Sequence, residues 1–186
     1  NVLFQRALYV GKKVRSETAV SSGSTSVPSV AVQLAESIFG CMGGKSALIL
    51  GAGAMDELSA KHLIARGVGK LTVANRTWER AYALAARFAG EAIRWEDFPA
   101  QLAAADVVIA STGAPQVVVT RAMVAAACRK RSGRSIFFID IAMPRDIEES
   151  VNDLDGVYLY RLEDFEAIVA KNMAGRAESV AAARAI

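Results

Sequence analysis

The chain has 186 residues, of which 53% are hydrophobic and 22% are charged, and its formal net charge is +3. This length and composition exclude a wholly disordered chain and favour one main domain with attachments. The Lys and Arg residues are scattered, so charge alone gives no reason to expect nucleic-acid binding. The sequence has neither a run of about 18 apolar residues nor a signal-peptide pattern, so we expect a cytoplasmic protein without a membrane span.

The N-terminal part is expected to precede the main domain. Residues 1–15 have apolar positions spaced by three and four, which predicts an amphipathic helix. The chain begins without Met, which suggests a piece of a longer protein. The Ser/Gly-rich segment that follows is a linker or a substrate-facing loop, and its composition favours the linker. Ser26 can then cap a helix that ends at Gly40.

From residue 46 onward, short apolar runs alternate with helical patterns. We expect strands at 46–50, 70–75, 91–95, 106–112, 135–142 and 156–160, and helices at 54–67, 77–90, 96–105 and 120–131. Because the apolar runs lack polar alternation and are separated by helices, they predict a mostly parallel sheet covered on both faces. The expected fold class is α/β, a doubly wound Rossmann-type sheet, followed by one long helix over residues 161–186.

The segment ALILGAGAMDEL, residues 47–58, has the form of a phosphate-binding turn. Gly51 allows a sharp turn after the strand, and Gly53 lets the backbone approach a pyrophosphate at the N-terminus of the next helix. Asp56 stands where the usual fingerprint has a third glycine, which permits close packing of helix and strand. We expect this turn to bind a dinucleotide, weakened by Asp56, rather than to be a tight turn without a ligand.

The second strand ends in ANRT, residues 74–77, and this segment bears on the choice of cofactor. A site that prefers NAD usually has an acidic residue here for the ribose hydroxyl, whereas this chain has Arg76. A guanidinium can pair with the 2′-phosphate of NADPH and stack on adenine, and Asn75 and Thr77 can add hydrogen bonds. The alternative is that Thr77 only caps the next helix and that Arg76 is solvated. We expect NADPH.

Two later segments end strands at the same edge of the predicted sheet. In STGAP, residues 111–115, Gly113 and the small side chains let the backbone approach a nicotinamide or its ribose. In DIAMPRDI, residues 140–147, we interpret Asp140 and Arg145 as a structural ion pair rather than as an acid-base pair.

The other reactive side chains form no evident catalytic constellation. Cys41 and Cys128 lack metal-ligand spacing and are interpreted as free thiols in a reducing compartment. The lone His62 is interpreted as a structural or surface residue. The chemistry expected from these residues is presentation of a cofactor, without a metal.

The segments VRSET, GAGAM, ANRT, STGAP, DIAMPRDI and DGVYLY follow one another in this order. Together they resemble the central part of the glutamyl-tRNA reductase family, which begins tetrapyrrole (porphyrin) biosynthesis by the five-carbon route. The resemblance covers nearly the whole chain. A GxG turn with Asn-Arg-Thr is also found in shikimate dehydrogenase, whereas DIAMPRDI followed by DGVYLY points to the reductase.

This resemblance implies an oxidoreductase that needs more than the present chain. In the family, a cysteine in an N-terminal catalytic domain attacks the ester of glutamyl-tRNA, and NADPH reduces the thioester to glutamate-1-semialdehyde. That cysteine lies upstream of VRSET, so neither Cys41 nor Cys128 inherits its role, and the chain alone is expected to bind NADPH without turnover.

The resemblance also implies a domain organisation. Residues 1–25 would be the end of the catalytic domain and a linker, residues 26–160 the NADPH-binding domain, and residues 161–186 the start of a spinal helix. That helix leads to a C-terminal dimerisation domain in the family, so the full-length protein is expected to be a homodimer.

The predicted cofactor site joins three segments. Its residues are Gly51, Ala52, Gly53, Ala54, Met55, Asp56, Asn75, Arg76, Thr77, Ser111, Thr112 and Gly113. Two other interpretations stay open. One is a shikimate-dehydrogenase-like NADP oxidoreductase, although no convincing Lys/Asp pair precedes residue 45. The other is a non-catalytic nucleotide-sensing or partner-binding module, which Asp56 and the missing nucleophile would suit.

Overall fold

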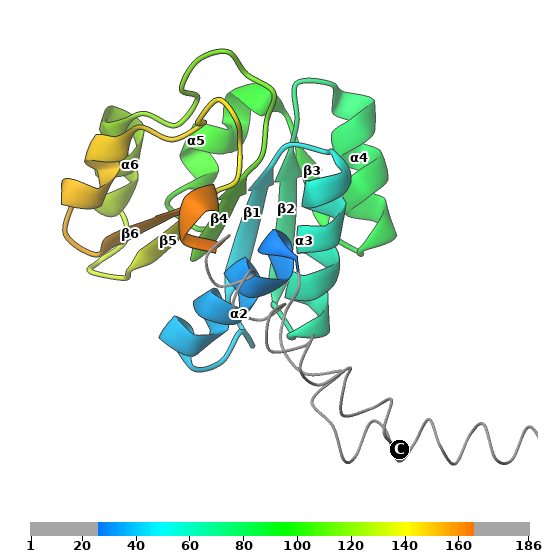
Figure 1. Cartoon of the computed structure of the whole chain (residues 1–186), viewed down its shortest axis with the longest axis horizontal. Coiled ribbons are helices and arrows are strands. Elements are labelled where there is room, and N and C mark those ends of the chain that lie inside the picture. The colour runs from blue at the N-terminus through cyan, green and yellow to red at the C-terminus, as the bar shows by residue number, and fades with distance from the viewer. Residues whose placement is uncertain (1–25, 166–186) are drawn as a thin grey trace, which may run out of the picture.

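The computed structural model describes residues 26–165, which form a six-stranded sheet with helices packed against it (Figure 1). The strands are β1 Ser46–Leu50, β2 Lys70–Ala74, β3 Glu91–Ile93, β4 Val107–Ala110, β5 Ile136–Asp140 and β6 Val157–Arg161. Their order in the sheet is β3-β2-β1-β4-β5-β6, and every neighbouring pair is parallel. The predicted doubly wound α/β fold is therefore confirmed.

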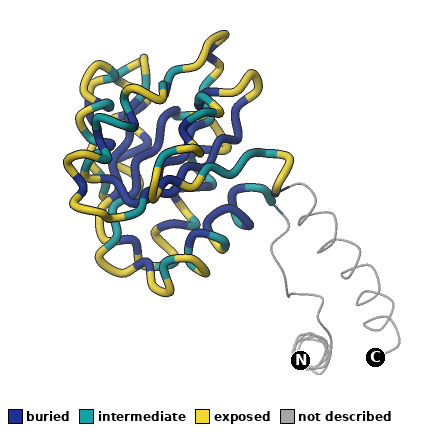
Figure 2. The backbone as a smooth tube through the Cα atoms, turned by 90° about the vertical axis from the view of Figure 1, so that its left-hand side faces the viewer, coloured by how far each residue is buried: buried dark blue, intermediate teal, exposed yellow. Residues whose placement is uncertain are grey.

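Helices cover both faces of this sheet. On one face lie α2 Val27–Phe39, α3 Ala54–Ala65 and α4 Trp78–Arg87, and on the other α5 Phe98–Gln101, α6 Arg121–Cys128 and the 3-10 helix η3 Glu149–Asp153. Neighbouring strand residues point to opposite faces, so Ile49 joins the first core and Leu48 the second. The buried backbone accordingly lies in the middle of the molecule and the exposed backbone in the loops (Figure 2). Because the strands are covered on both sides, their sequences need no polar alternation.

The ends of α2 agree with the prediction. The Ser26 side chain accepts a hydrogen bond from the Ser29 amide at 3.4 Å, and Gly40, with φ of 73°, ends the helix. The short helix predicted over residues 96–105 is present but covers fewer residues. A 3-10 turn, η2 Trp95–Asp97, precedes the short α5, because Pro99 has no N–H with which to continue a preceding helical turn.

Two of the predicted helices fall on segments that are not described. The helix predicted over residues 1–15 lies outside the described residues, as does most of the helix predicted over residues 161–186, whose first residue, Arg161, ends β6 instead. Within residues 26–165, none of the helices combines the length and the apolar character needed to cross a bilayer.

A buried ion pair ties together the amino ends of the central strands. The Arg131 side chain is 1% exposed, and its Nη2 lies 3.2 Å from Asp106 Oδ1. Asp106 Oδ2 in turn accepts a hydrogen bond from the Ser46 amide at 3.1 Å. The guanidinium also donates to the backbone carbonyls of Leu102, Ala103, Ala105, Arg134 and Ser135. These bonds join the starts of β1, β4 and β5 at the edge opposite the predicted cofactor site.

Candidate functional site

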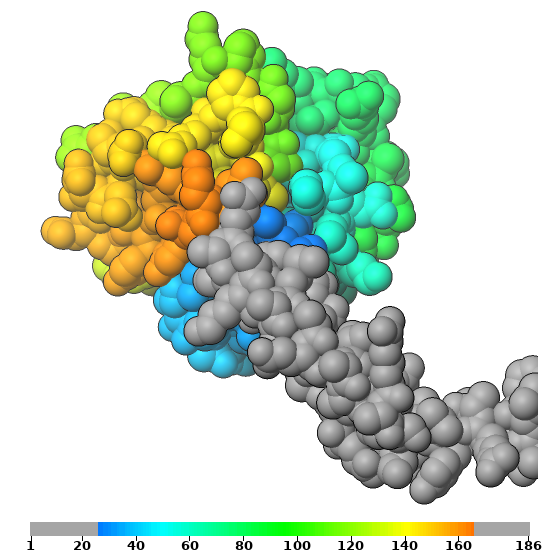
Figure 3. Space-filling view, in the orientation of Figure 1, coloured from blue at the N-terminus to red at the C-terminus, as the bar shows by residue number. Residues whose placement is uncertain are grey.

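A cavity of about 310 Å³ lies at the carboxyl ends of β1, β2 and β4. This is the switch point of the sheet: the chain runs from β1 to β2 on one side and from β4 to β5 on the other, and such sheets bind ligands at this point. The cavity is lined by Gly51, Ala52, Gly53, Asn75, Arg76, Thr77, Arg80, Trp95, Ser111, Thr112, Gly113 and Ala114. In Figure 3 the loop after β4, in light green, projects at the top of the molecule beside the yellow segment that follows β5.

The turn between β1 and α3 has the geometry expected of a phosphate-binding turn. Gly51 has φ of 134°, a conformation that side chains rarely adopt, and a Cβ there would lie 2.5 Å from Asp56 Oδ2. Gly53 is the N-cap residue of α3, so the free backbone amides of the first helical turn follow it directly. The backbone of this turn can therefore come close to an anionic group, which the positive end of the helix dipole would also attract.

Three predicted site residues do not line the cavity. Met55 is 51% exposed on the outside of α3, and Ala54 lines a neighbouring hollow between α3 and α4. Asp56 is fully buried behind the turn. The other predicted residues all lie in the cavity wall, so the structure brings together the three segments that the sequence analysis selected.

Asp56 occupies the space between the turn and the end of β4. Its Oδ2 accepts a hydrogen bond from the Gly53 amide at 2.9 Å, which caps the first turn of α3 from inside. Its Oδ1 is buried without a hydrogen-bond partner. Burial raises the pKa of Asp56 from 3.8 to about 6, a shift that the Ser111 hydroxyl and the Gly53 amide partly offset and that the nearby Asp146 increases.

The raised pKa of Asp56 predicts a pH-dependent cost to folding. The folded state binds a proton on the Asp56 carboxylate more tightly than the unfolded state does. This protonation stabilises the fold fully below pH 4, and the stabilisation is lost as the pH rises through about 6. The loss amounts to at most about 3 kcal/mol. In urea unfolding, Asp56→Asn should match the wild-type free energy of unfolding near pH 4 and exceed it at pH 7. An equal difference at both pH values would contradict this account.

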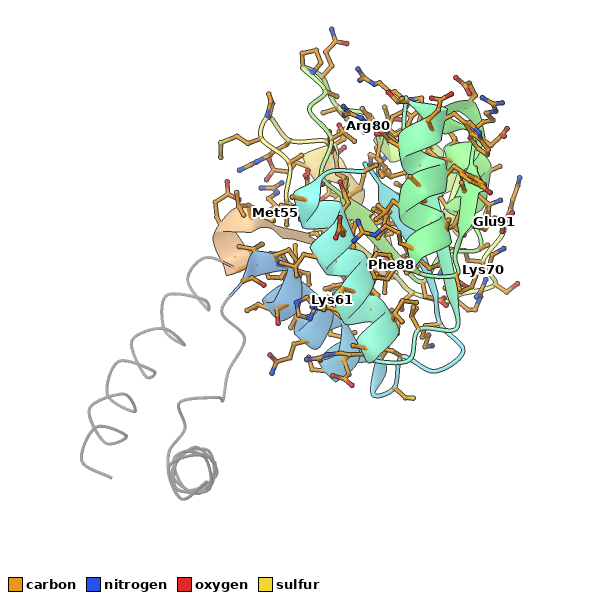
Figure 4. All side chains as sticks on the ribbon, turned by 90° about the vertical axis from the view of Figure 1, so that its right-hand side faces the viewer. Met55, Lys61, Lys70, Arg80, Phe88 and Glu91 are labelled. Atoms are coloured by element: carbon orange, nitrogen blue, oxygen red, sulfur yellow. The ribbon has the colours of Figure 1, made fainter. Side chains whose placement is uncertain are left out.

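Arg76 and Arg80 supply positive charge on the β2 side of the cavity. Arg76 lies in the loop before α4, with its guanidinium 5.9 Å from the centre of the Trp95 ring, and Arg80 lies in the first turns of α4. Figure 4 shows Arg80 near the upper end of α4, the same end of the molecule as Met55 at the start of α3. Arg80 and Trp95 were not predicted as site residues, although the four-residue spacing from Arg76 was a signal for Arg80.

Asn75 and Thr77 hold the loop that carries Arg76. The Asn75 side-chain amide donates to the Thr77 carbonyl at 3.0 Å, which fixes the loop before α4. Thr77 occupies the N-cap position, but its side chain makes no cap hydrogen bond. The Thr77 hydroxyl, in the cavity wall, is therefore not committed to the helix end.

Asp146 fixes the loop after β4 and is a site residue that the sequence analysis missed. The Thr112 amide donates to Asp146 Oδ2 at 2.6 Å, and the Thr112 hydroxyl donates to Oδ1. The Ala114 amide donates to the same Thr112 hydroxyl at 3.1 Å. Burial raises the pKa of Asp146, while the bonds from Thr112 and the charge of Arg76 lower it. No local pattern marks Asp146, because it acts 34 residues away in the sequence.

The predicted ion pair between Asp140 and Arg145 was wrong. The Asp140 carboxylate instead accepts hydrogen bonds from the amides of Ala142, Asp146 and Ile147, at 2.9–3.1 Å. Arg145 pairs with Glu163 at 3.3 Å. A carboxylate at the end of a buried strand bonds to backbone amides because the loop after the strand folds back over it. Asp140 thereby shapes the loop that carries Asp146.

The cysteines and the histidine lie away from the cavity. Cys41 is exposed and Cys128 half-buried, and both are free thiols, as predicted. His62 lies near the end of α3, where partial burial and then Arg66 lower its pKa. Among residues 26–165, no cluster of His, Cys, Asp and Glu side chains could hold a metal ion.

The sheet order, the glycine turn and the cavity at the switch point define a Rossmann-type domain that binds NAD(P). Residues 33–168 match the family model described as Shikimate / quinate 5-dehydrogenase, and the chain belongs to this family.

Comparison with individual proteins narrows the relationship. The chain is 47% identical over its whole length to a glutamyl-tRNA reductase of Solidesulfovibrio magneticus, of which it covers 41%. The solved glutamyl-tRNA reductase of Methanopyrus kandleri is 41% identical, with a TM-score of 0.90, over 98% of this chain and 46% of that one. The chain therefore corresponds to the central NAD(P)-binding domain of glutamyl-tRNA reductase, an oxidoreductase, and spans about two fifths of the length of such relatives.

The likeness to dehydrogenases of the shikimate type is more distant. Quinate dehydrogenase from Corynebacterium glutamicum, solved in complex with NAD, is 20% identical, with a TM-score of 0.59, over 86% of this chain and 63% of that one. At this identity the comparison shows a shared fold and gives no evidence for a shared substrate.

Proposed function

We propose that the chain binds NADPH and is the reductant-binding part of a glutamyl-tRNA reductase that forms glutamate-1-semialdehyde in tetrapyrrole biosynthesis. One observation carries the choice of cofactor: the cavity wall contains Arg76 and Arg80 and, among the described residues, no acidic side chain. Two guanidinium groups favour the 2′-phosphate of NADPH, and a site for NAD would need an acceptor for the ribose hydroxyl instead.

The residues of the cavity suit each part of this cofactor. The Gly51–Gly53 turn and the N-terminus of α3 would hold the pyrophosphate, and Arg76 and Arg80 the 2′-phosphate. Ser111, Thr112 and Gly113 would flank the nicotinamide side, with Thr112 held in place by Asp146. When bound, NADPH supplies a hydride.

The proposed reaction also needs a thiol that this cavity does not supply. In the reduction of glutamyl-tRNA, a cysteine thiolate displaces the tRNA and forms a thioester, which a hydride then converts to the aldehyde with release of the thiolate. Cys41 and Cys128 are absent from the cavity wall, so we assign the nucleophile to the rest of the full-length protein. We likewise propose glutamyl-tRNA as its substrate and a homodimer as its assembly.

Calorimetric titration of the chain with NADPH and with NADH tests this proposal. We expect NADPH to bind about 100-fold more tightly or better, because the 2′-phosphate adds charge-assisted hydrogen bonds to two guanidinium groups. The full-length protein should then reduce glutamyl-tRNA with NADPH. Equal affinities would contradict the cofactor assignment, and NADPH binding by a full-length protein without turnover would favour a nucleotide-sensing module.

A further inference from the structure

The carboxylate of Asp56 lies directly behind the wall that would face a pyrophosphate. Its Oδ2 accepts the Gly53 amide and is the atom closest to the Cβ position of Gly51, and both glycines line the cavity. The side chain itself is 0% exposed. A charge on this carboxylate is therefore separated from the cavity by backbone rather than by water.

The surroundings of Asp56 do not neutralise this charge. Across the end of β4 it faces a second carboxylate, Asp146, and the Ser111 hydroxyl. Its helix neighbour Glu57 points outward and pairs with Arg87 at 2.6 Å. The positive charge of Arg76, from the loop after β2, lowers the pKa of Asp146 rather than that of Asp56. The other carboxylate oxygen, Oδ1, accepts no hydrogen bond, so a proton on this oxygen would remove a buried charge without breaking the Gly53 hydrogen bond.

We propose that a dinucleotide bound at this turn makes the protein take up a proton on Asp56. The inference rests on the proposed binding of NADPH, whose pyrophosphate would bring negative charge to the cavity side of Gly51 and Gly53. Like charges at short range through low-dielectric material disfavour ionisation, so the bound state holds Asp56 protonated. Burial raises the pKa of Asp56 to about 6, so in the free protein this carboxyl group is mostly ionised at pH 7. A modest further rise in its pKa on binding is enough to protonate it.

The linkage predicts the direction of the pH effect. Between the pKa values of Asp56 in the free and bound states, deprotonation competes with binding, so the Kd for NADPH rises with pH. We expect a rise of about threefold or more between pH 7 and pH 8.5, a range in which the 2′-phosphate is already ionised. Asp56→Asn keeps an oxygen for the Gly53 amide but carries no charge, so its Kd should stay level over this range.

Calorimetry of the chain with NADPH in buffers of different ionisation enthalpy tests the proton uptake directly. At pH 7.5, wild type should take up about a third of a proton or more, which corresponds to a threefold or larger rise in Kd over 1.5 pH units, and Asp56→Asn should take up none. Glu57→Gln removes a charge from the same helical turn outside the cavity and should behave as wild type. If wild type and Asp56→Asn bind NADPH with the same pH profile and the same proton uptake, this inference is overturned while the proposed function stands. If neither binds NADPH or NADH, both are overturned.

Discussion

Replacement of Arg131 by Met should lower the free energy of unfolding by about 3–5 kcal/mol, the range for breaking a buried ion pair by removing one partner. The side chain is 1% exposed, and its loss would leave Asp106 with only the exposed Arg134 as a cationic partner and would remove the donor to the Leu102 and Ser135 carbonyls. Met fills similar volume, so the loss reflects the missing charge and hydrogen bonds rather than a cavity. Chemical denaturation at pH 7 measures it.

Arg134 provides a matched control for this prediction. It reaches the same Asp106 oxygen at 3.4 Å, but its side chain is 55% exposed. Water screens such a pair, so Arg134→Met should cost less than about 1 kcal/mol. Should Arg131→Met prove as mild as Arg134→Met, the buried pair would not be what holds the starts of β1, β4 and β5 together.

The second large effect concerns cofactor selection. Replacement of both Arg76 and Arg80 by Ala should weaken NADPH binding by about 100-fold or more, because each charge-assisted hydrogen bond contributes about 1.5–3 kcal/mol. NADH lacks the 2′-phosphate, so its affinity should change by less than about threefold. The preference between the two cofactors, measured by titration at pH 8, would then largely disappear.

A third arginine separates this effect from a general loss of positive charge. Arg94 is exposed and lies 4.4 Å from the centre of the Trp78 ring, outside the residues that line the cavity. Arg94→Ala should leave both affinities unchanged. If the double variant weakened NADPH and NADH in parallel, Arg76 and Arg80 would support the loop or the adenine rather than select the 2′-phosphate.

Much of the fold was predictable because each strand of a doubly covered parallel sheet is a short apolar run. The six predicted strands all occur, with ends that shift by at most a few residues, as for 106–112 against β4 Val107–Ala110. The glycine turn and the Asn75–Thr77 segment were also predictable, since backbone conformation and loop position there depend on the residues themselves. All but three of the predicted site residues reached the cavity wall.

Two buried carboxylates were harder to place from the sequence, for one physical reason. Asp140 and Arg145 are five residues apart and of opposite charge, yet the buried carboxylate took the backbone amides of its own loop and the exposed guanidinium took Glu163. Asp56, which was predicted as a cofactor-site residue, is buried behind the glycine turn and bonds to the Gly53 amide. In each case a buried polar group bonded to the donors that the folded chain placed beside it, which sequence spacing does not reveal.

The sequence by itself determined the succession of strands and helices along the chain, the position of the glycine turn and the presence of arginine rather than an acid after β2, because these depend on local pattern and residue type. Only the tertiary structure decided that Asp146 holds Thr112, that Arg131 holds Asp106, and that Asp56 is buried against the cavity wall. These contacts join residues from different loops, and a polar side chain is satisfied by whichever partner the packing of the sheet brings within reach.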